Sequence, residues 1–378
     1  MPLPSSLSRR AVTAAVLLAT VAASAGCASF DDQTATADQG TFSEVPTEVY
    51  QPSAPSAPDS PDEPGEPPQG PCVDPNPAII ATCLSQTSGV RPADAEGKTT
   101  YVAERTTGKI ILSKRYGPQR AVATVAVDGS GDGGLVDFEL SPTWMQDQMI
   151  FALITTPSDN RVVRIAPTGS VKPVLTGIPK GATGNMGSIA FTDPNTLTVA
   201  TGDAGDPTAA QNRSSLAGKI FQINPNQNGP QPKILASGLR SNVALCRDGD
   251  AGSLYVADSG KAGDRLSLVS HDSLKTLWTW ADRPGLTGCA TSPDSIAVSI
   301  GSKKRLDVFA KPNGANPVLS EPDAQDTSKT FGAVGRMTTL GGKIQLATIN
   351  KTLHGTKIES FDDRVAVFFP QQPAEDRT

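Results

Sequence analysis

Histidine is nearly absent from this sequence, and its scarcity limits the chemistry that the chain can perform. Only two of the 378 residues are histidines, His271 and His354, and neither lies near a recognisable motif. We expect both in surface loops. No CxxC motif is present, which argues against a zinc site of cysteine and histidine ligands. The formal net charge is −5 and basic residues do not cluster, so nucleic acid is not expected as a partner.

Long hydrophobic runs are lacking, apart from one at the N-terminus that is too short to span a bilayer as a stable helix. This run, residues 11–25, follows Arg9 and Arg10 and ends in the sequence SAGC at Cys27. The basic–apolar–small order predicts an export signal over residues 1–26, with Sec export favoured over the twin-arginine route. The SAGC sequence resembles a lipobox, which predicts a diacylglyceride on Cys27. Signal cleavage that leaves a free thiol is the alternative, and an oxidising compartment disfavours it.

Apolar residues do not cluster between residues 27 and 71, where proline recurs every few positions. Such a segment buries too little surface to offset its chain entropy, so we predict a disordered stalk. Polyproline-like chain rises about 3.1 Å per residue, and the stalk can therefore reach on the order of 100 Å. We expect the protein to be anchored to the cell membrane through its lipid, on the extracytoplasmic face.

Cysteine is sparse, and four cysteines remain after Cys27. An even number in an exported chain indicates disulfides, and four cysteines allow three pairings. We favour Cys72–Cys83, which are close in sequence, and Cys246–Cys289, which occupy similar places in successive repeats. A metal site is the alternative, but no nearby histidine supports it.

Helical periodicity is missing from Thr99 onward, where short β-branched runs alternate with Gly, Pro, Asn and Asp turns. This pattern predicts many short strands. Pairs of such runs recur, and their first members begin near Val136, Ile189, Val243, Cys289 and Met337. A period of about 50 residues is typical of a four-stranded propeller blade. The sequence therefore predicts an all-β fold, a six-bladed β-propeller over residues 72–370, with a tail at 371–378. Ring closure is expected to pair residues 364–368 with the first blade near residues 100–104.

Residues 184–224 contain the most informative motif. Within it stand Asn185, Gly187, Phe191, the TGD sequence at 201–203, Gln211 and the SLAGKI sequence at 215–220. This pattern resembles the core of the soluble PQQ-dependent sugar dehydrogenases, the glucose/sorbosone dehydrogenase-like β-propellers, and the resemblance covers residues 131–266. It implies PQQ and calcium at one mouth of the propeller channel, and a histidine that removes the sugar's proton. Gly184 stands at the position of that histidine, and Asn185 cannot accept a proton at useful pH.

The resemblance also assigns the cofactor contacts. Asp132 stands where the family has glutamine, and its charge would repel a cofactor that carries three carboxylates. It is also the only candidate for a substitute base. Arg240 is retained and could clamp a carboxylate. The cofactor-binding candidates are thus Arg240, Asn185 and Asp132, and PQQ itself is not expected to bind. Restoring both lost groups, by Gly184→His with Asp132→Gln, is predicted to recover dye reduction.

A calcium loop is partly kept in LYVADSGKAGDRL, residues 254–266. Hard cations prefer several oxygen ligands, and the candidate metal ligands are Asp258, Asp264 and Asp203. Of the two tryptophans on one strand, Trp278 and Trp280, we expect one in the core, while the other is a candidate to stack on a sugar at the channel mouth.

Three functions are compatible with these residues. The favoured one is a membrane-anchored propeller that has lost the catalytic base and binds a carbohydrate or an envelope protein. Its order of signal, stalk and altered propeller resembles that of a mycobacterial lipoprotein. The alternatives are a PQQ- and calcium-dependent sugar oxidoreductase with a relocated base, and a calcium-dependent propeller hydrolase of the lactonase type.

Overall fold

The computed structural model describes residues 70–249, 252–270, 273–312, 318–353 and 355–370. The export signal, Cys27, most of the stalk, both histidines and the tail lie outside the described residues. No helix within the described ranges is long and apolar enough to cross a membrane.

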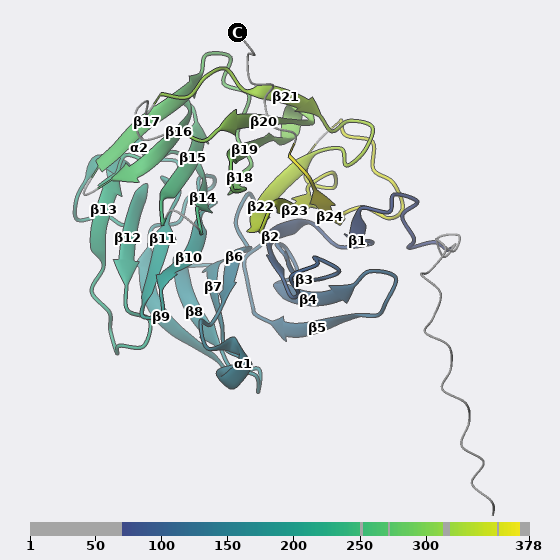
Figure 1. Ribbon diagram of the computed structural model, residues 1–378. Coiled ribbons are helices and arrows are strands. Elements are labelled where there is room, and N and C mark those ends of the chain that lie inside the picture. Colours follow the sequence, from purple (N-terminus) through teal and green to yellow (C-terminus); the bar gives the residue numbers. More distant parts are fainter. Residues whose placement is uncertain (1–69, 250–251, 271–272, 313–317, 354, 371–378) are drawn as a thin grey trace, which may run out of the picture. The chain divides into compact units, whose positions relative to one another are not determined.

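Six antiparallel sheets of four strands surround a central channel, which confirms the predicted six-bladed propeller (Figure 1). Blade 1 contains β2 (Thr87–Pro92), β3 (Thr99–Glu104), β4 (Lys109–Lys114) and β5 (Gln119–Thr124). Blade 2 contains β6 (Leu135–Leu140), β7 (Ile150–Thr155), β8 (Asn160–Ile165) and β9 (Val171–Ile178). Blade 3 contains β10 (Ser188–Asp193), β11 (Thr196–Ala200), β12 (Lys219–Ile223) and β13 (Lys233–Ser237).

The remaining three blades follow the same plan, except for the last strand. Blade 4 contains β14 (Asn242–Arg247), β15 (Leu254–Gly260), β16 (Gly263–Ser270) and β17 (Ser273–Trp280). Blade 5 contains β18 (Gly288–Thr291), β19 (Ser295–Ile300), β20 (Arg305–Ala310) and β21 (Asp323–Asp326). Blade 6 contains β22 (Val334–Leu340), β23 (Lys343–Thr348), β24 (Val365–Phe368) and β1 (Ile79–Ala81).

Within the part of the chain that the structure describes, helix is confined to single turns between strands. These are α1 (Trp144–Asp147), α2 (Pro207–Gln211) and a 3-10 turn at Gly301–Lys303. The Asp206 side chain caps α2 by accepting hydrogen bonds from the main-chain N–H groups of Thr208 and Ala209, the usual way to satisfy the free donors of a helix start.

The innermost strands β2, β6, β10, β14, β18 and β22 contact one another in turn around the ring. They run in the same direction. The residues just before these strands lie at one end of the channel, where Asp132 accepts a hydrogen bond from Gly184. The last residues of these strands lie at the other end, where the Thr291 hydroxyl donates to the Arg247 carbonyl. We call these ends the entry mouth and the exit mouth.

The ring is closed by the N-terminal strand. In blade 6, β24 lies between β23 and β1, and Ile79 pairs with Ala366. The predicted closing strand was therefore placed correctly, but its predicted partner near residues 100–104 was wrong. Those residues form β3, which already pairs with β2 on one edge and β4 on the other, so neither edge is free to close the ring.

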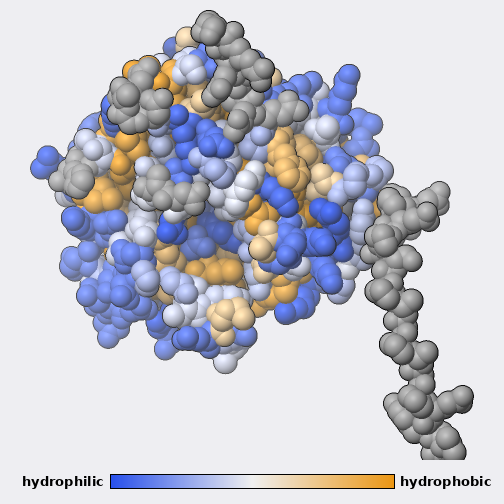
Figure 2. Space-filling view, in the orientation of Figure 1, coloured by the Kyte–Doolittle hydropathy of each residue, from blue (hydrophilic) through white to orange (hydrophobic). Residues whose placement is uncertain are grey.

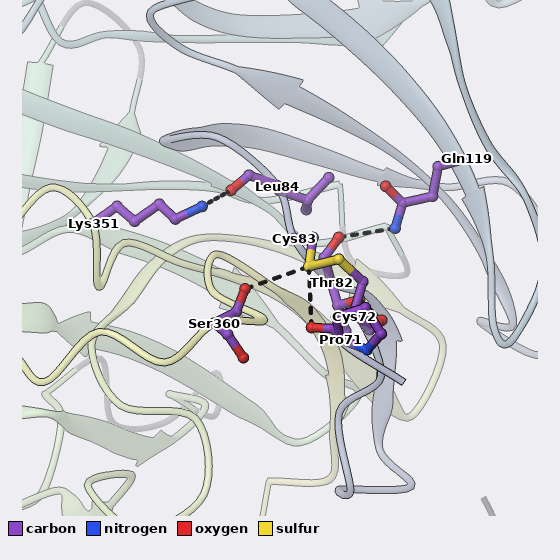
Figure 3. Close-up of a disulfide and its surroundings, with 8 residues drawn as sticks. All are labelled: Pro71, Cys72, Thr82, Cys83, Leu84, Gln119, Lys351 and Ser360. Carbon is purple, nitrogen blue, oxygen red and sulfur yellow. Dashed lines mark hydrogen bonds between the residues drawn. A yellow bond between two sulfur atoms is a disulfide. The ribbon is translucent and has the colours of Figure 1, made fainter. Parts of the chain in front are cut away.

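Both predicted disulfides are confirmed. Cys72–Cys83, with Cα atoms 5.6 Å apart, ties down the segment that leads into β1, and Figure 3 shows it beside Gln119 and Lys351. The Gln119 side chain donates to the carbonyl of Thr82 at 2.9 Å. Cys246–Cys289, 5.3 Å between Cα atoms, joins the inner strands of blades 4 and 5.

Removing the Cys246–Cys289 bridge, with alanine at both positions, is expected to lower the free energy of unfolding by about 4 kcal/mol, against about 3 kcal/mol for the Cys72–Cys83 pair. The bridges span sequence separations of 43 and 11 residues, and a longer closed loop removes more entropy from the unfolded chain. Urea unfolding of the two double variants measures both losses. A larger loss for the shorter loop would contradict the entropic argument.

The blades pack against one another through apolar side chains. Phe191, Leu197 and Val199 are buried, and the Phe191 ring packs edge-on against Phe151. The expectation for the tryptophans was wrong. Trp278 and Trp280 are two residues apart, so they share a face of β17, and both rings pack against Phe309, with centroids 5.5 Å and 5.8 Å away. Since β17 is the outermost strand of its blade, neither ring reaches the channel.

Candidate functional site

Gly184, which the sequence resemblance aligns with the histidine of the sugar dehydrogenases, lies at the entry mouth between β9 and β10. It is buried, and its backbone is left-handed, with φ of +81°. A Cβ atom built on it would lie 2.5 Å from Asp203 Oδ1 and 2.5 Å from the main-chain nitrogen of Gly205. Such distances are far inside van der Waals contact, so the backbone at this position has no room for any side chain.

Asp132, the candidate substitute base, does meet Gly184. Its carboxylate accepts hydrogen bonds from the Gly184 N–H at 2.7 Å and from the Asn185 side-chain amide at 2.7 Å. The Asn185 N–H adds a longer bond at 3.3 Å. Burial lowers the pKa of the neighbouring Arg105, and the negative charge of Asp132 opposes part of that shift. The carboxylate therefore anchors the chain at the mouth.

Every hydrogen-bonding position of the Asn185 side chain is occupied. Its amide oxygen accepts from the Gly181 N–H at 3.0 Å and from the Asn160 side chain at 3.1 Å. Its amide nitrogen donates to Asp132 and, at 2.9 Å, to the Gly181 carbonyl. An Asn side chain has two donor and two acceptor positions, and all four are used. Asn185 is left with no free group to offer a cofactor.

Arg240 and Asp258 form an ion pair with each other. Asp258 is fully buried, and one of its oxygens lies 3.2 Å from Arg240 Nη1. The other oxygen lies 2.8 Å from Arg265 Nε. A carboxylate between two guanidinium groups is a poor cation ligand, because both positive charges would repel the metal. The same pairing engages the guanidinium that would clamp a cofactor carboxylate.

The candidate metal ligands are not brought together. Asp203 accepts from the Gly205 N–H at 2.9 Å and from the Ser241 hydroxyl at 3.0 Å, whereas Asp264 accepts from the Gly285 N–H at 2.6 Å. Among the described residues, no group of three or more His, Cys, Asp or Glu side chains could hold a metal ion. Calcium takes six to eight oxygens, and PQQ needs free donors for its carboxylates. The residues at the entry mouth fit neither group.

Lys219, in the SLAGKI motif, has a role that the sequence did not reveal. Its side chain is fully buried, and its ammonium donates to the carbonyls of Ala209, Ala210 and Ala217 at 3.1, 2.7 and 2.8 Å. Burial lowers the pKa of this lysine. The motif therefore fastens the α2 turn to β12, a structural role that does not depend on catalysis.

A charged network inside the channel was also missed. Arg91 of β2 lies 3.0 Å from a Glu139 oxygen and 3.2 Å from an Asp137 oxygen, both on β6. The other Asp137 oxygen accepts from the Ser188 hydroxyl at 2.7 Å. Burial raises the pKa of Glu139, and Arg91 opposes that shift. The signal in the sequence was the VDFEL run of β6, in which two carboxylates interrupt an apolar inner strand.

This network lines a cavity of about 550 Å³. The cavity lies toward the exit mouth, since its walls include Leu140, Arg247 and Thr339 at or next to the ends of inner strands. None of Gly184, Asp132 and Arg240 is part of its lining. The channel thus has two distinct ends: an entry mouth whose polar side chains are paired with one another, and an exit mouth that holds the cavity.

Comparison with known proteins agrees with this architecture. A model of the Glucose / Sorbosone dehydrogenase family matches residues 92–273. The PQQ-bound aldose sugar dehydrogenase of Streptomyces coelicolor is similar at 26% identity and a TM-score of 0.68, over 77% of this chain and 96% of that one. A putative oxidoreductase (glucose dehydrogenase) of Thermus thermophilus is 22% identical with a TM-score of 0.67, over 77% and 98%.

The apo-form of the soluble aldose sugar dehydrogenase of Escherichia coli gives 15% identity and a TM-score of 0.61, over 76% of this chain and 98% of that one. The likeness to the Thermus and Escherichia proteins shows the fold alone. No curated protein matches the sequence.

Proposed function

We propose that this chain, a glucose/sorbosone dehydrogenase-like propeller, does not oxidise sugars and serves instead as a lipid-anchored binding protein for a carbohydrate or an envelope protein. The observation that carries the proposal is the geometry at Gly184. Sugar oxidation of the family type needs a general base within hydrogen-bond reach of the sugar hydroxyl, and losing one costs about 10²–10⁴ in rate. Here the position of that base has no side chain and no room for one.

The rest of the entry mouth supports the same conclusion. Its polar groups are paired with one another, as Asp132 is with Asn185 and Arg240 is with Asp258. A cofactor would have to break these bonds and leave buried charges without partners, which is costly. The membrane anchor at Cys27 and the stalk remain part of the proposal, on the sequence pattern given above.

The second candidate is an oxidoreductase in which Asp132 replaces the histidine. One observation favours it, since the carboxylate lies against the Gly184–Asn185 segment. The three hydrogen bonds that it accepts there already use the carboxylate to hold the main chain. A lactonase-type hydrolase is disfavoured further, because Asp258 is paired with two arginines.

With PQQ and calcium supplied in excess, the detergent-solubilised full-length protein is expected to reduce no dye in the presence of glucose. The reason is the combined loss of the base and of free cofactor contacts. Dye reduction tests activity, and calorimetric titration with PQQ, with and without calcium, tests binding separately. Asp132→Asn is the informative variant. Turnover in the unmodified protein that disappears in this variant would establish the relocated base and overturn the proposal.

A further inference from the structure

Arg336 is a buried cation at the inner end of the channel cavity. It is the third residue of β22, is only 5% exposed, and lines the cavity. One guanidinium nitrogen, Nη2, reaches across the channel and donates to the Gly187 carbonyl at 3.0 Å and to the Asn242 side-chain oxygen at 3.2 Å. The side chain therefore lies between the entry mouth and the cavity.

The other guanidinium nitrogens of Arg336 are not satisfied. Nε and Nη1 have no hydrogen-bond partner among the described residues. Burial lowers the pKa of Arg336 to about 10, with Asp137 opposing the shift. Buried charges are normally paired, because an unpaired one bears the full cost of leaving water. Each of these nitrogens can donate a charge-assisted hydrogen bond, and a carboxylate oxygen is a strong acceptor for it.

Arg91 differs from Arg336 in this respect. Its charge is balanced by Asp137 and Glu139, which form the wall of the cavity on the β6 side. A guanidinium that is already paired attracts an anion less, so the acidic end of a ligand is directed toward Arg336 and toward Arg247, an exposed cation at the rim. The carboxylates of the wall are suited to accept hydrogen bonds from hydroxyl groups.

The remaining lining is mixed. Thr338 and Thr339 add hydroxyl groups, and apolar side chains such as Phe191 and Met337 supply surface for the carbon skeleton. Figure 2 shows the centre of the molecule hollowed, with hydrophilic and hydrophobic residues side by side around the hollow. A cavity of about 550 Å³ is within the usual range of roughly 300–1,000 Å³ for small-molecule sites.

We propose that the channel cavity binds a sugar acid, a small polyhydroxylated ligand with one carboxylate, which Arg336 holds at the inner end while Arg247 attracts it at the rim. This inference rests on the proposed binding function and assigns its ligand class and its location. The site lies at the opposite end of the channel from Gly184.

Calorimetric titration of the detergent-solubilised full-length protein with D-glucuronate tests the proposal, with D-glucose as the neutral probe of the same size. We expect glucuronate to bind at least about tenfold more tightly than glucose, because a hydrogen-bonded ion pair adds affinity that the neutral sugar cannot gain. Arg336→Met is expected to lower glucuronate affinity by about 10–100-fold.

A loss of affinity in the Arg336 variant could come from a folding defect. Arg247→Glu is therefore the second variant, because Arg247 is exposed and its replacement should not disturb the fold. We expect a loss of about three- to tenfold for glucuronate. Arg120→Glu, at an exposed position on the outer strand β5, is the matched control and should have no effect. The proposal is overturned if glucuronate does not bind, if both sugars bind equally, or if Arg247→Glu and Arg120→Glu behave alike. Dye reduction in the unmodified protein would instead contradict the proposed function, so the two failures are distinguishable.

Discussion

Gly184→His is expected to restore no sugar oxidation and to destabilise the propeller, by about 2–5 kcal/mol. Two costs add. Placing a residue other than glycine in the left-handed region of backbone conformation costs about 1–2 kcal/mol. Overpacking adds about 1–3 kcal/mol, because the new Cβ would collide with Asp203 and the backbone of Gly205. Urea unfolding gives the stability change, and dye reduction with PQQ and calcium gives the activity.

A second glycine offers a matched control. Gly169, in the turn between β8 and β9, has φ of +83°, and nothing lies within 4 Å of a Cβ built on it. Gly169→Ala should therefore show the backbone cost alone, about 1–2 kcal/mol, whereas Gly184→Ala should show that cost and the collision. Equal losses at the two positions would mean that the mouth can open to admit a side chain.

The same geometry revises an expectation from the sequence. Gly184→His with Asp132→Gln was predicted to recover dye reduction, but the histidine has no space, and the second change removes the carboxylate that accepts the Gly184 and Asn185 hydrogen bonds. We now expect the double variant to be less stable than Gly184→His alone. Dye reduction by a well-folded double variant would contradict this.

The propeller should be more stable at pH 5 than at pH 8, and Asp363 is the expected cause. Burial raises the pKa of this carboxyl to about 7, and the neighbouring Asp362 adds to the shift. The folded state therefore holds a proton that the unfolded chain, with a pKa near 3.8, releases. The stabilisation that this proton contributes is fully present below the pKa of the unfolded state, and it is lost as the pH rises toward about 7. At about 1.4 kcal/mol per pKa unit, the loss is on the order of 3 kcal/mol.

Asp363→Asn should remove most of this pH dependence, because an amide has no proton to lose. Asp363 lies at the ring closure, where its N–H donates to the Leu84 carbonyl at 3.0 Å and its carboxyl accepts from the Lys351 N–H at 3.2 Å. Asp326→Asn is the control, since that carboxyl is exposed and its pKa is lowered by hydrogen bonds from Ser328. Thermal unfolding between pH 5 and pH 8 measures the slopes. An unchanged slope in Asp363→Asn would place the titrating group elsewhere.

Much of the fold was predictable because its signals are local. Strand alternation and turn residues are read over a few positions, and a period of about 50 residues specifies a blade. The Cys246–Cys289 bridge followed from the same repeat, since equivalent positions in adjacent blades must be neighbours. The ring closure was not predictable in full. β1 has three residues, too few to carry a pattern, and its partner lies at the other end of the chain.

The candidate site was likewise predictable only in part. The sequence by itself determined that the chain is a six-bladed propeller and that a glycine stands at position 184, where the resemblance expects a histidine, because both depend only on which residue stands where. Only the tertiary structure decided that Asp132 and Asn185 bind each other, that Arg240 is paired with Asp258, and that two nitrogens of Arg336 have no acceptor among the described residues. Each depends on which side chains meet across blades, and such contacts are set by the packing of strands that are distant in the sequence.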